Sequence, residues 1–426
     1  MSNWFERGDP NAPGNAGLDH TRFRRVAFGG PKLERLIVEG LCCRPRFPAR
    51  VYDLRVGNSA MSMETCQLIS YIAPAAPATR RLATGSEPFL RPEIGFTPNW
   101  YRSAIGIDFG RRWHTEPAYR RETLLAMRGE LKRRFPGTKI GGIDCPDKPL
   151  DLLTGAYGCT SVAAIYAVPI VYAQNNWPNC EHRYLSDDEV DRLEPPDLNT
   201  NPFYQQLMAQ VDWIAAHEGR VEGFINWQGV LNNAYRLRGE KLFYDMIDSP
   251  QRCRRLFDCI CTTMTEAARL LHERQRETGV KVGFFTVSNC LVNMVSPRQY
   301  RDILLPFDRR IGEAFGCIGI HNCAWNADPY IADYAAVPHL GYIDMGLDSD
   351  LARARQAIAD ARRALMYTPM DLANKSLETI RADLERVARD YAPCDIVVGD
   401  IEAGTPDERV LAFLDLCGEI NRRREN

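Results

Sequence analysis

Long apolar runs are missing from this chain of 426 residues. No stretch reaches the roughly 18 apolar residues that a membrane-spanning helix needs. Residues 1–15 are polar and rich in Pro and Gly, without the apolar segment of a secretory signal. We therefore expect a cytoplasmic protein that has no membrane partner.

An excess of charge of one sign is also missing. The 53 basic and 55 acidic residues leave a formal net charge of -2, and neither sign is concentrated in one half of the chain. Binding to the phosphate backbone of a nucleic acid depends on clustered Lys and Arg. Nucleic acid is therefore excluded as an expected partner.

Several familiar sequence motifs are absent: GxGxxG, the P-loop, HExxH and GxSxG. The 14 cysteines include no CxxC pair and are scattered from Cys42 to Cys417. This spacing does not fit the dense framework of a disulfide-stabilised protein, so we expect most of them to be reduced, buried, small apolar side chains.

What the sequence does contain is an alternation of short β-branched runs with longer helical patterns, repeated at about the length of a β-strand plus a helix. This pattern predicts parallel strands. Eight are expected, at Glu93–Thr97, Lys139–Asp144, Val221–Trp227, Val282–Val287, Cys317–His321, Gly341–Met345, Leu365–Pro369 and Ile396–Val398. Eight such units favour a closed (β/α)8 TIM barrel in the α/β class, and an open doubly wound sheet is the alternative.

The expected barrel occupies residues 91–426, and residues 1–90 form an N-terminal extension packed on it. Residues 145–220 carry many Pro, Asn and aromatic residues, including Trp177-Pro178-Asn179, which do not fit a simple crossover helix. We interpret this segment as an insertion after the second strand.

Polar residues follow most of the predicted strands. In a β/α barrel the active site lies at the carboxyl ends of the strands, where a solvated pocket tolerates such groups. The candidates for binding substrate are Asn226, Trp227, Gln228, Asn289, Cys290, Trp325 and Glu402, and the candidates for catalysis are His321, Cys323, Asp344 and Asp400.

His321-x-Cys323 is the sharpest of these signals. Alternate residues of an extended segment point the same way, so an imidazole nitrogen and a thiolate can bind one ion. Imidazole with thiolate suits Zn²⁺, and a third ligand from another strand would leave one position open for substrate.

A resemblance to a known superfamily rests on a set of short motifs in the second half of the chain. These are Gly283–Asn289, Val295–Tyr300, Gly319–Cys323, Val398–Asp400 with Gly404–Pro406, and more weakly Asn226–Gly239 with Asp248–Pro250. The chain thus resembles the superfamily of uroporphyrinogen decarboxylase and the cobalamin-dependent methyltransferases over about residues 90 to 420. The resemblance implies a β/α barrel and is greatest to the zinc-dependent corrinoid methyltransferases.

In that branch the resemblance implies a zinc ion held by the His-x-Cys and by a later Cys that follows the last strand. Asp400 falls where this Cys is expected, which predicts a site of His321, Cys323 and Asp400. Glu402 or Cys290 as the third ligand, or loss of the metal, are the alternatives. A carboxylate ligand makes zinc a stronger Lewis acid than a third ligand of sulfur would.

The function implied is transfer of a methyl group between a small methoxy, methylamine or thiol compound and a corrinoid (cobalamin) carried by a partner protein. The Asp ligand slightly favours a methoxy or similar donor, which makes the reaction a demethylation. Asn226, Gln228 and Asn289 are expected to hydrogen-bond the substrate, Asp344 to orient it or transfer a proton, and Trp227 and Trp325 to supply apolar walls. A homodimer is compatible with the sequence. The alternative function is a decarboxylase or carbon-carbon lyase on the same barrel without methyl transfer.

Overall fold

The computed structural model describes residues 88–143, 149–283 and 285–425. The proposed N-terminal extension, residues 1–90, therefore lies almost entirely outside the described residues, and so does Asp144. The division into an extension, a barrel and an insertion stays a prediction. Within the described residues, none of the helices combines the length and the apolar character needed to cross a bilayer.

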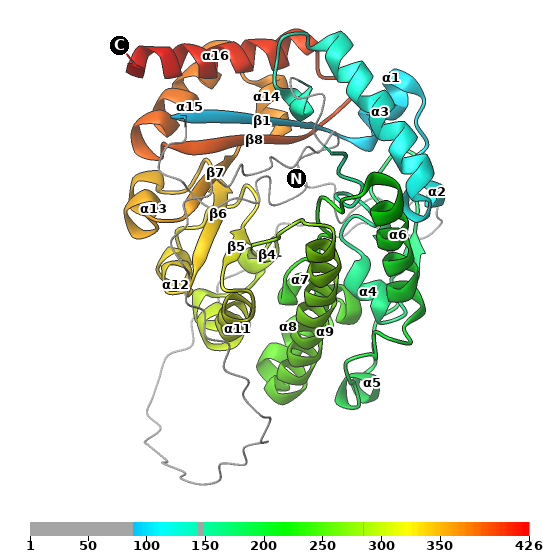
Figure 1. Ribbon diagram of the computed structural model, residues 1–426. Coiled ribbons are helices and arrows are strands. Elements are labelled where there is room, and N and C mark those ends of the chain that lie inside the picture. Colours follow the sequence, from blue (N-terminus) through cyan, green and yellow to red (C-terminus); the bar gives the residue numbers. More distant parts are fainter. Residues whose placement is uncertain (1–87, 144–148, 284, 426) are drawn as a thin grey trace, which may run out of the picture. The chain divides into compact units, whose positions relative to one another are not determined.

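Six parallel strands form the main sheet, in the order β1-β8-β7-β6-β5-β4 (Figure 1). Their bounds are β1 Leu90–Phe96, β4 Phe285–Ser288, β5 Ile318–His321, β6 Leu340–Gly346, β7 Arg362–Met366 and β8 Cys394–Ile401. Each overlaps one of the predicted strands. Six of the eight predicted strands are thus confirmed, and the protein has a mixed α/β fold.

The pairing of β1 with β8 is the one that a barrel requires, because it joins the first and last strands of the sheet. The described residues do not close the ring. Residues 139–143 hold a short 3-10 helix, η1 (Ile140–Gly142), beside β1, and 221–227 run as irregular backbone. The two strands predicted there are wrong. The closed barrel stays a prediction.

Glycines explain why these two segments are not strands. Gly141 and Gly142 have φ values of 59° and 69°, which an extended strand cannot accommodate. Gly223 has a φ of 92° and packs against the side chain of Asp151, where a Cβ atom would collide with the carboxylate. The apolar pattern suggested strands, but the backbone turns at the glycines.

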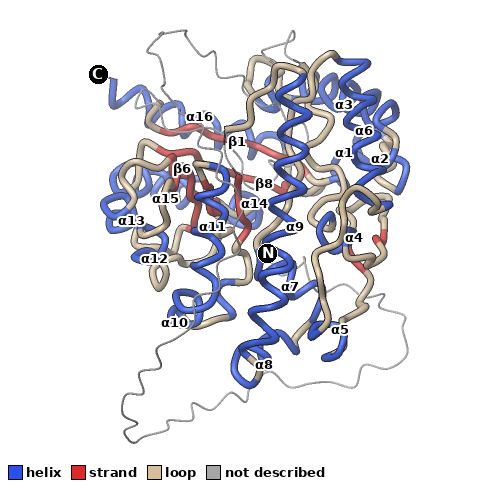
Figure 2. Tube along the Cα trace, turned by 60° about the horizontal axis from the view of Figure 1, so that its bottom comes forward, coloured by secondary structure: helices blue, strands red, loops and turns tan. Residues whose placement is uncertain are grey.

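Helices flank the sheet and the remaining part of the chain. Helix α11 contacts β4 and β5, α14 contacts β8 and α16 contacts β1, while the long helix α9 contacts α11 and α4 (Figure 2). The bounds are α1 Pro98–Ile105, α2 Arg111–Thr115, α3 Pro117–Arg134, α4 Ser161–Ile165, α5 Asp187–Asp191, α6 Pro202–Glu218, α7 Val230–Arg238, α8 Lys241–Asp248, α9 Pro250–Glu277, η2 Val292–Met294, α10 Pro297–Gln299, η3 Tyr300–Leu304, α11 Leu305–Phe315, α12 Ile331–Ala335, α13 Leu351–Ala357, α14 Pro369–Asn374, α15 Leu377–Asp390 and α16 Asp407–Glu425.

The sequence also predicts helices over Ser296–Phe315, which Ser296-Pro297 opens, and over Leu351–Ala364. Ser296 caps α10 by accepting from the backbone N–H of Gln299, as the Ser-Pro signal indicated. The helix expected over Leu351–Ala364 is shorter, because strand β7 begins at Arg362. A two-stranded antiparallel hairpin, β2 (Ile170–Val171) with β3 (Asn179–Cys180), lies in the segment interpreted as an insertion.

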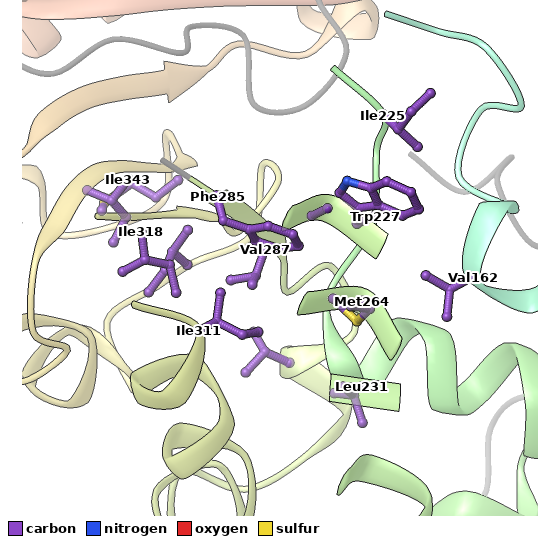
Figure 3. Packing of buried hydrophobic residues seen from close by; sticks show 14 of the residues in the cluster. Val162, Ile225, Trp227, Leu231, Met264, Phe285, Val287, Ile311, Ile318 and Ile343 are labelled. Atoms are coloured by element: carbon purple, nitrogen blue, oxygen red, sulfur yellow. The ribbon is translucent and has the colours of Figure 1, made fainter. Parts of the chain in front are cut away.

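The two faces of the sheet carry different side chains, because successive residues of a strand point to opposite faces. Ile318, Ile343 and Val287 belong to the main hydrophobic core, where they pack with residues of the flanking helices such as Ile311 (Figure 3). Residues of the other face form a separate small cluster, consisting of Cys317, Tyr342, Ala364 and Val397 with Met366. His321 and Asp344 share this second face by their period-2 spacing.

A buried ion cluster lies near the start of the strands. Asp395 of β8 is fully buried and accepts two hydrogen bonds from the guanidinium of Arg362, at 2.7 and 2.8 Å, and a third from Arg91. A carboxylate removed from water is tolerated only where such partners replace its hydration. Asp395 therefore links β1, β7 and β8 from inside the sheet.

We predict that Asp395→Ala lowers the free energy of unfolding by about 3 to 5 kcal/mol, since it removes the buried carboxylate that Arg362 and Arg91 share. Urea denaturation followed by circular dichroism measures this. Asp415→Ala, at an exposed position of α16, is the control and should change stability by less than about 0.5 kcal/mol. Equal stabilities for the two variants would contradict the role given to Asp395.

Candidate metal centre

The carboxyl ends of β4, β5 and β6 bring together four of the residues singled out in the sequence. In the parallel register Ser288 pairs with His321 and His321 pairs with Asp344. His321 and Asp344 are therefore neighbours on adjacent strands, and Cys290 and Cys323 each follow the end of a strand by two residues. These four residues were predicted at strand ends, and the structure brings them together there.

His321 is oriented by a carboxylate. Its Nδ1 lies 2.7 Å from Oδ2 of Asp344, and since a carboxylate only accepts, Nδ1 carries the proton. Asp344 is fully buried and also accepts from the Tyr342 hydroxyl at 3.0 Å and from the backbone N–H of Asn322 at 2.8 Å. This arrangement fixes the ring and leaves Nε2 as the atom that can bind a ligand.

The ring presents Nε2 to two thiols. Cys323 Sγ lies 2.9 Å from His321 Nε2 and 3.0 Å from Cys290 Sγ. The ligand atoms of Cys290, His321 and Cys323 all lie within 4.8 Å of one another, close enough for one ion to be shared. We call these three residues the Cys-His-Cys group. The donor set fits zinc, which binds thiolate sulfur and imidazole nitrogen.

Mutual electrostatics prepare the group for a cation. The Cys323 thiol donates to Cys290, which lowers the pKa of Cys290 well below its usual value and raises that of Cys323 well above it. Burial alone would lower the pKa of His321, but the charges of Asp344 and Cys290 raise it to about 10. The group without metal thus holds a thiolate and an imidazolium, whose proton a metal ion would displace.

Three predicted site residues have a left-handed backbone that non-glycine residues rarely adopt. The φ values are 61° at Gln228, 57° at Cys323 and 57° at Asp400. Such conformations carry a cost and are concentrated at functional sites, where the surrounding structure holds them. These three residues come from separate segments of the chain, and the shared backbone feature supports a common site formed by these segments.

Asp400 and Glu402 differ in position. Asp400 lies outside the Cys-His-Cys group but interacts electrostatically with His321 and Cys323, and it accepts from the Trp177 indole at 3.4 Å. Burial raises the pKa of Asp400. Glu402 is exposed, and its carboxylate accepts from Thr97 and Asn99 at the start of α1. Cys290, one of the alternatives for the third ligand, lies within the group, and the role of Asp400 as a ligand stays a prediction.

The predicted substrate-binding residues also differ in their partners and in their exposure. Asn226 Oδ1 accepts from the backbone and side-chain N–H groups of Gln228, at 3.1 and 3.2 Å. Asn289 donates to the buried Asp308. Trp227 is 4% exposed and belongs to the main core (Figure 3), which favours packing over substrate contact, whereas Trp325 is 39% exposed.

Two residues of α7 were missed by the sequence reasoning. Asn232 donates to Gln228 at 2.9 Å, accepts from the backbone N–H of Leu291 at 3.2 Å and hydrogen-bonds Cys290. Arg236, one turn later on the same helix face, interacts electrostatically with Cys290. The spacing of Gln228, Asn232 and Arg236 by four residues was the available signal. Asn232 and Arg236 lie on a helix, whereas the sequence prediction covers residues at strand ends.

Comparisons with known proteins support the fold only. No family model and no curated protein matches the chain. Among solved structures, a methyltransferase from Methanosarcina mazei is similar with a TM-score of 0.55 and 16% identity, over 78% of this chain and 94% of that chain. The likeness supports the mixed α/β fold described above.

We predict that Asp344→Asn weakens zinc binding by about 10- to 100-fold, because His321 loses the carboxylate that orients it and strengthens its basicity. Competition with a chromophoric chelator measures the affinity. Asp348→Asn, an exposed change just past the same strand, serves as the control. Wild-type affinity in Asp344→Asn would show that the pair does not support a metal ligand.

Proposed function

We propose that this chain is a zinc-dependent methyltransferase that moves a methyl group between a small substrate and a corrinoid carried by a partner protein. The observation that carries the proposal is the Cys-His-Cys group at the strand ends. The structural likeness to a methyltransferase agrees with it. The corrinoid and its carrier come from the sequence resemblance alone.

The ligands fit the proposed ion. Cys290, His321 and Cys323 would supply two thiolates and one imidazole, three protein ligands that leave a fourth position for substrate. When bound, zinc would lower the pKa of a substrate thiol or polarise the heteroatom of a methyl donor.

The remaining residues keep these ligands in place. Asp344 retains the Nδ1 proton of His321, and Tyr342 and the Asn322 backbone hold Asp344 in turn. The Tyr334 hydroxyl donates to Asn322 at 2.9 Å and so fixes the residue between the ligands His321 and Cys323. Such partners orient a ligand before substrate arrives, which shortens the reorganisation required for reaction.

The kind of substrate is revised by the ligand set. A carboxylate ligand had favoured a methoxy donor, because it leaves zinc a stronger Lewis acid. Cys290 instead contributes a second sulfur, which donates more electron density to the ion. Two thiolates favour a substrate that acts as a nucleophile, so we propose a thiol as the methyl acceptor. Asp400, which interacts electrostatically with His321, would then accept the proton that the thiol loses.

A decarboxylase or carbon-carbon lyase on the same fold is the second candidate. It requires no metal at the Cys-His-Cys group, so metal analysis separates the two. Turnover is tested with methylcobalamin and a panel of thiol, methoxy and methylamine compounds, following the absorption change of the corrinoid. Methyl transfer without bound zinc, or zinc-loaded protein inactive on the whole panel, would contradict the proposal.

We predict about one zinc ion per chain in the purified protein, and loss of most of it in Cys290→Ser and in Cys323→Ser, because each removes a thiolate ligand. Inductively coupled plasma mass spectrometry gives the stoichiometry. Asp400→Asn should keep the zinc.

Cys259→Ser is the matched control, since this thiol of α9 only donates to the Leu193 carbonyl. Zinc retained in Cys290→Ser but lost in Asp400→Asn would return the third ligand to the carboxylate.

A further inference from the structure

A positively charged side chain lies beside the Cys-His-Cys group without a carboxylate partner. The Arg236 guanidinium has three side-chain contacts among the described residues: Asn179 Oδ1 at 3.0 Å, Cys159 Sγ at 2.6 Å and Cys180 Sγ at 4.0 Å. None of these groups is a carboxylate. Arg236 also interacts electrostatically with Cys290 of the Cys-His-Cys group.

Three buried arginines of the described residues, Arg120, Arg238 and Arg362, are satisfied differently from the half-buried Arg236. Arg238, two residues later, pairs with Asp245 and Asp187, and Arg362 pairs with Asp395. Arg120 donates to two backbone carbonyls and to Gln210. A guanidinium has five N–H donors, and sulfur is a weak acceptor. Arg236 alone in this comparison relies on thiols, so much of its hydrogen-bonding capacity is unused.

The two thiols do not neutralise Arg236 at neutral pH. Burial raises the pKa of Cys159 above its usual value and that of Cys180 to about 11, so both stay protonated. The charge of Arg236 is therefore available to a ligand.

Helix α7 connects Arg236 to the Cys-His-Cys group. Gln228, Asn232 and Arg236 are spaced by four residues at and along the start of α7, and Asn232 hydrogen-bonds Cys290. Strand β3 supplies Asn179 and Cys180 to Arg236, while Trp177 just before it donates to Asp400. One short segment thus contacts both Arg236 and Asp400, and each of these interacts electrostatically with the Cys-His-Cys group.

We propose that Arg236, with Asn179, binds a carboxylate of the substrate, so that the substrate is a small thiol acid whose sulfur reaches the Cys-His-Cys group. This rests on the proposed function and narrows it to an anionic substrate class. A planar guanidinium matches a carboxylate with two parallel hydrogen bonds, which an uncharged amide cannot reproduce.

The test compares 3-mercaptopropionate with 3-mercaptopropionamide, which has the same shape and no charge at neutral pH. Isothermal titration calorimetry on the zinc-loaded full chain gives both affinities. We expect the acid to bind at least about tenfold more tightly than the amide in the wild type, about 1.4 kcal/mol. Arg236→Met should abolish this preference with zinc content unchanged, and Arg236→Lys should keep part of it.

Arg269→Met removes the same charge from an exposed position of α9 and is the matched control. Equal affinities for acid and amide in the wild type, or an undiminished preference in Arg236→Met, would overturn the proposal. So would a variant that loses zinc but keeps the ratio, because Arg236 would then serve the metal ligands only. An Arg236-dependent preference without any methyl transfer would instead leave this inference standing and remove the proposed function.

Discussion

The register between β5 and β6 is the constraint on which the site depends. It sets His321 opposite Asp344, so that a fully buried carboxylate holds the imidazole proton on Nδ1 and turns Nε2 toward two thiols. A shift of one residue in this register would turn one of the two side chains to the other face of the sheet, toward the main hydrophobic core, and would separate the pair. The same alternation of polar and apolar residues therefore packs the sheet and orients His321.

Much of this could be predicted from the sequence, because it follows from local periodicity. The six strands are predicted by runs of β-branched residues. The polar residues that follow them are candidates because the active site of a barrel lies at the strand ends. Periodicity failed at 139–143 and 221–227, where glycines with positive φ turn the backbone. A pattern of apolar residues does not reveal how a glycine will be used.

The third ligand shows a different limit of sequence reasoning. Spacing along the chain pointed to Asp400, whereas contact in space joins Cys290 to His321 and Cys323. The adjacency of β4 and β5 brings Cys290 close, and sequence distance carries no such information. Arg236 illustrates the same point, since its partners Cys159 and Cys180 lie in a separate segment far along the chain. Contacts contributed by irregular segments were out of reach of the sequence pattern.

The proposed site requires that two sulfurs and one imidazole nitrogen bind one zinc ion. X-ray absorption spectroscopy at the zinc edge tests it most directly, because scattering from sulfur and from nitrogen or oxygen is distinguishable. The account predicts two sulfur neighbours at about 2.3 Å together with one imidazole nitrogen at about 2.0 Å. A first shell with one sulfur and several light atoms would contradict it, and would place a carboxylate where Cys290 is proposed.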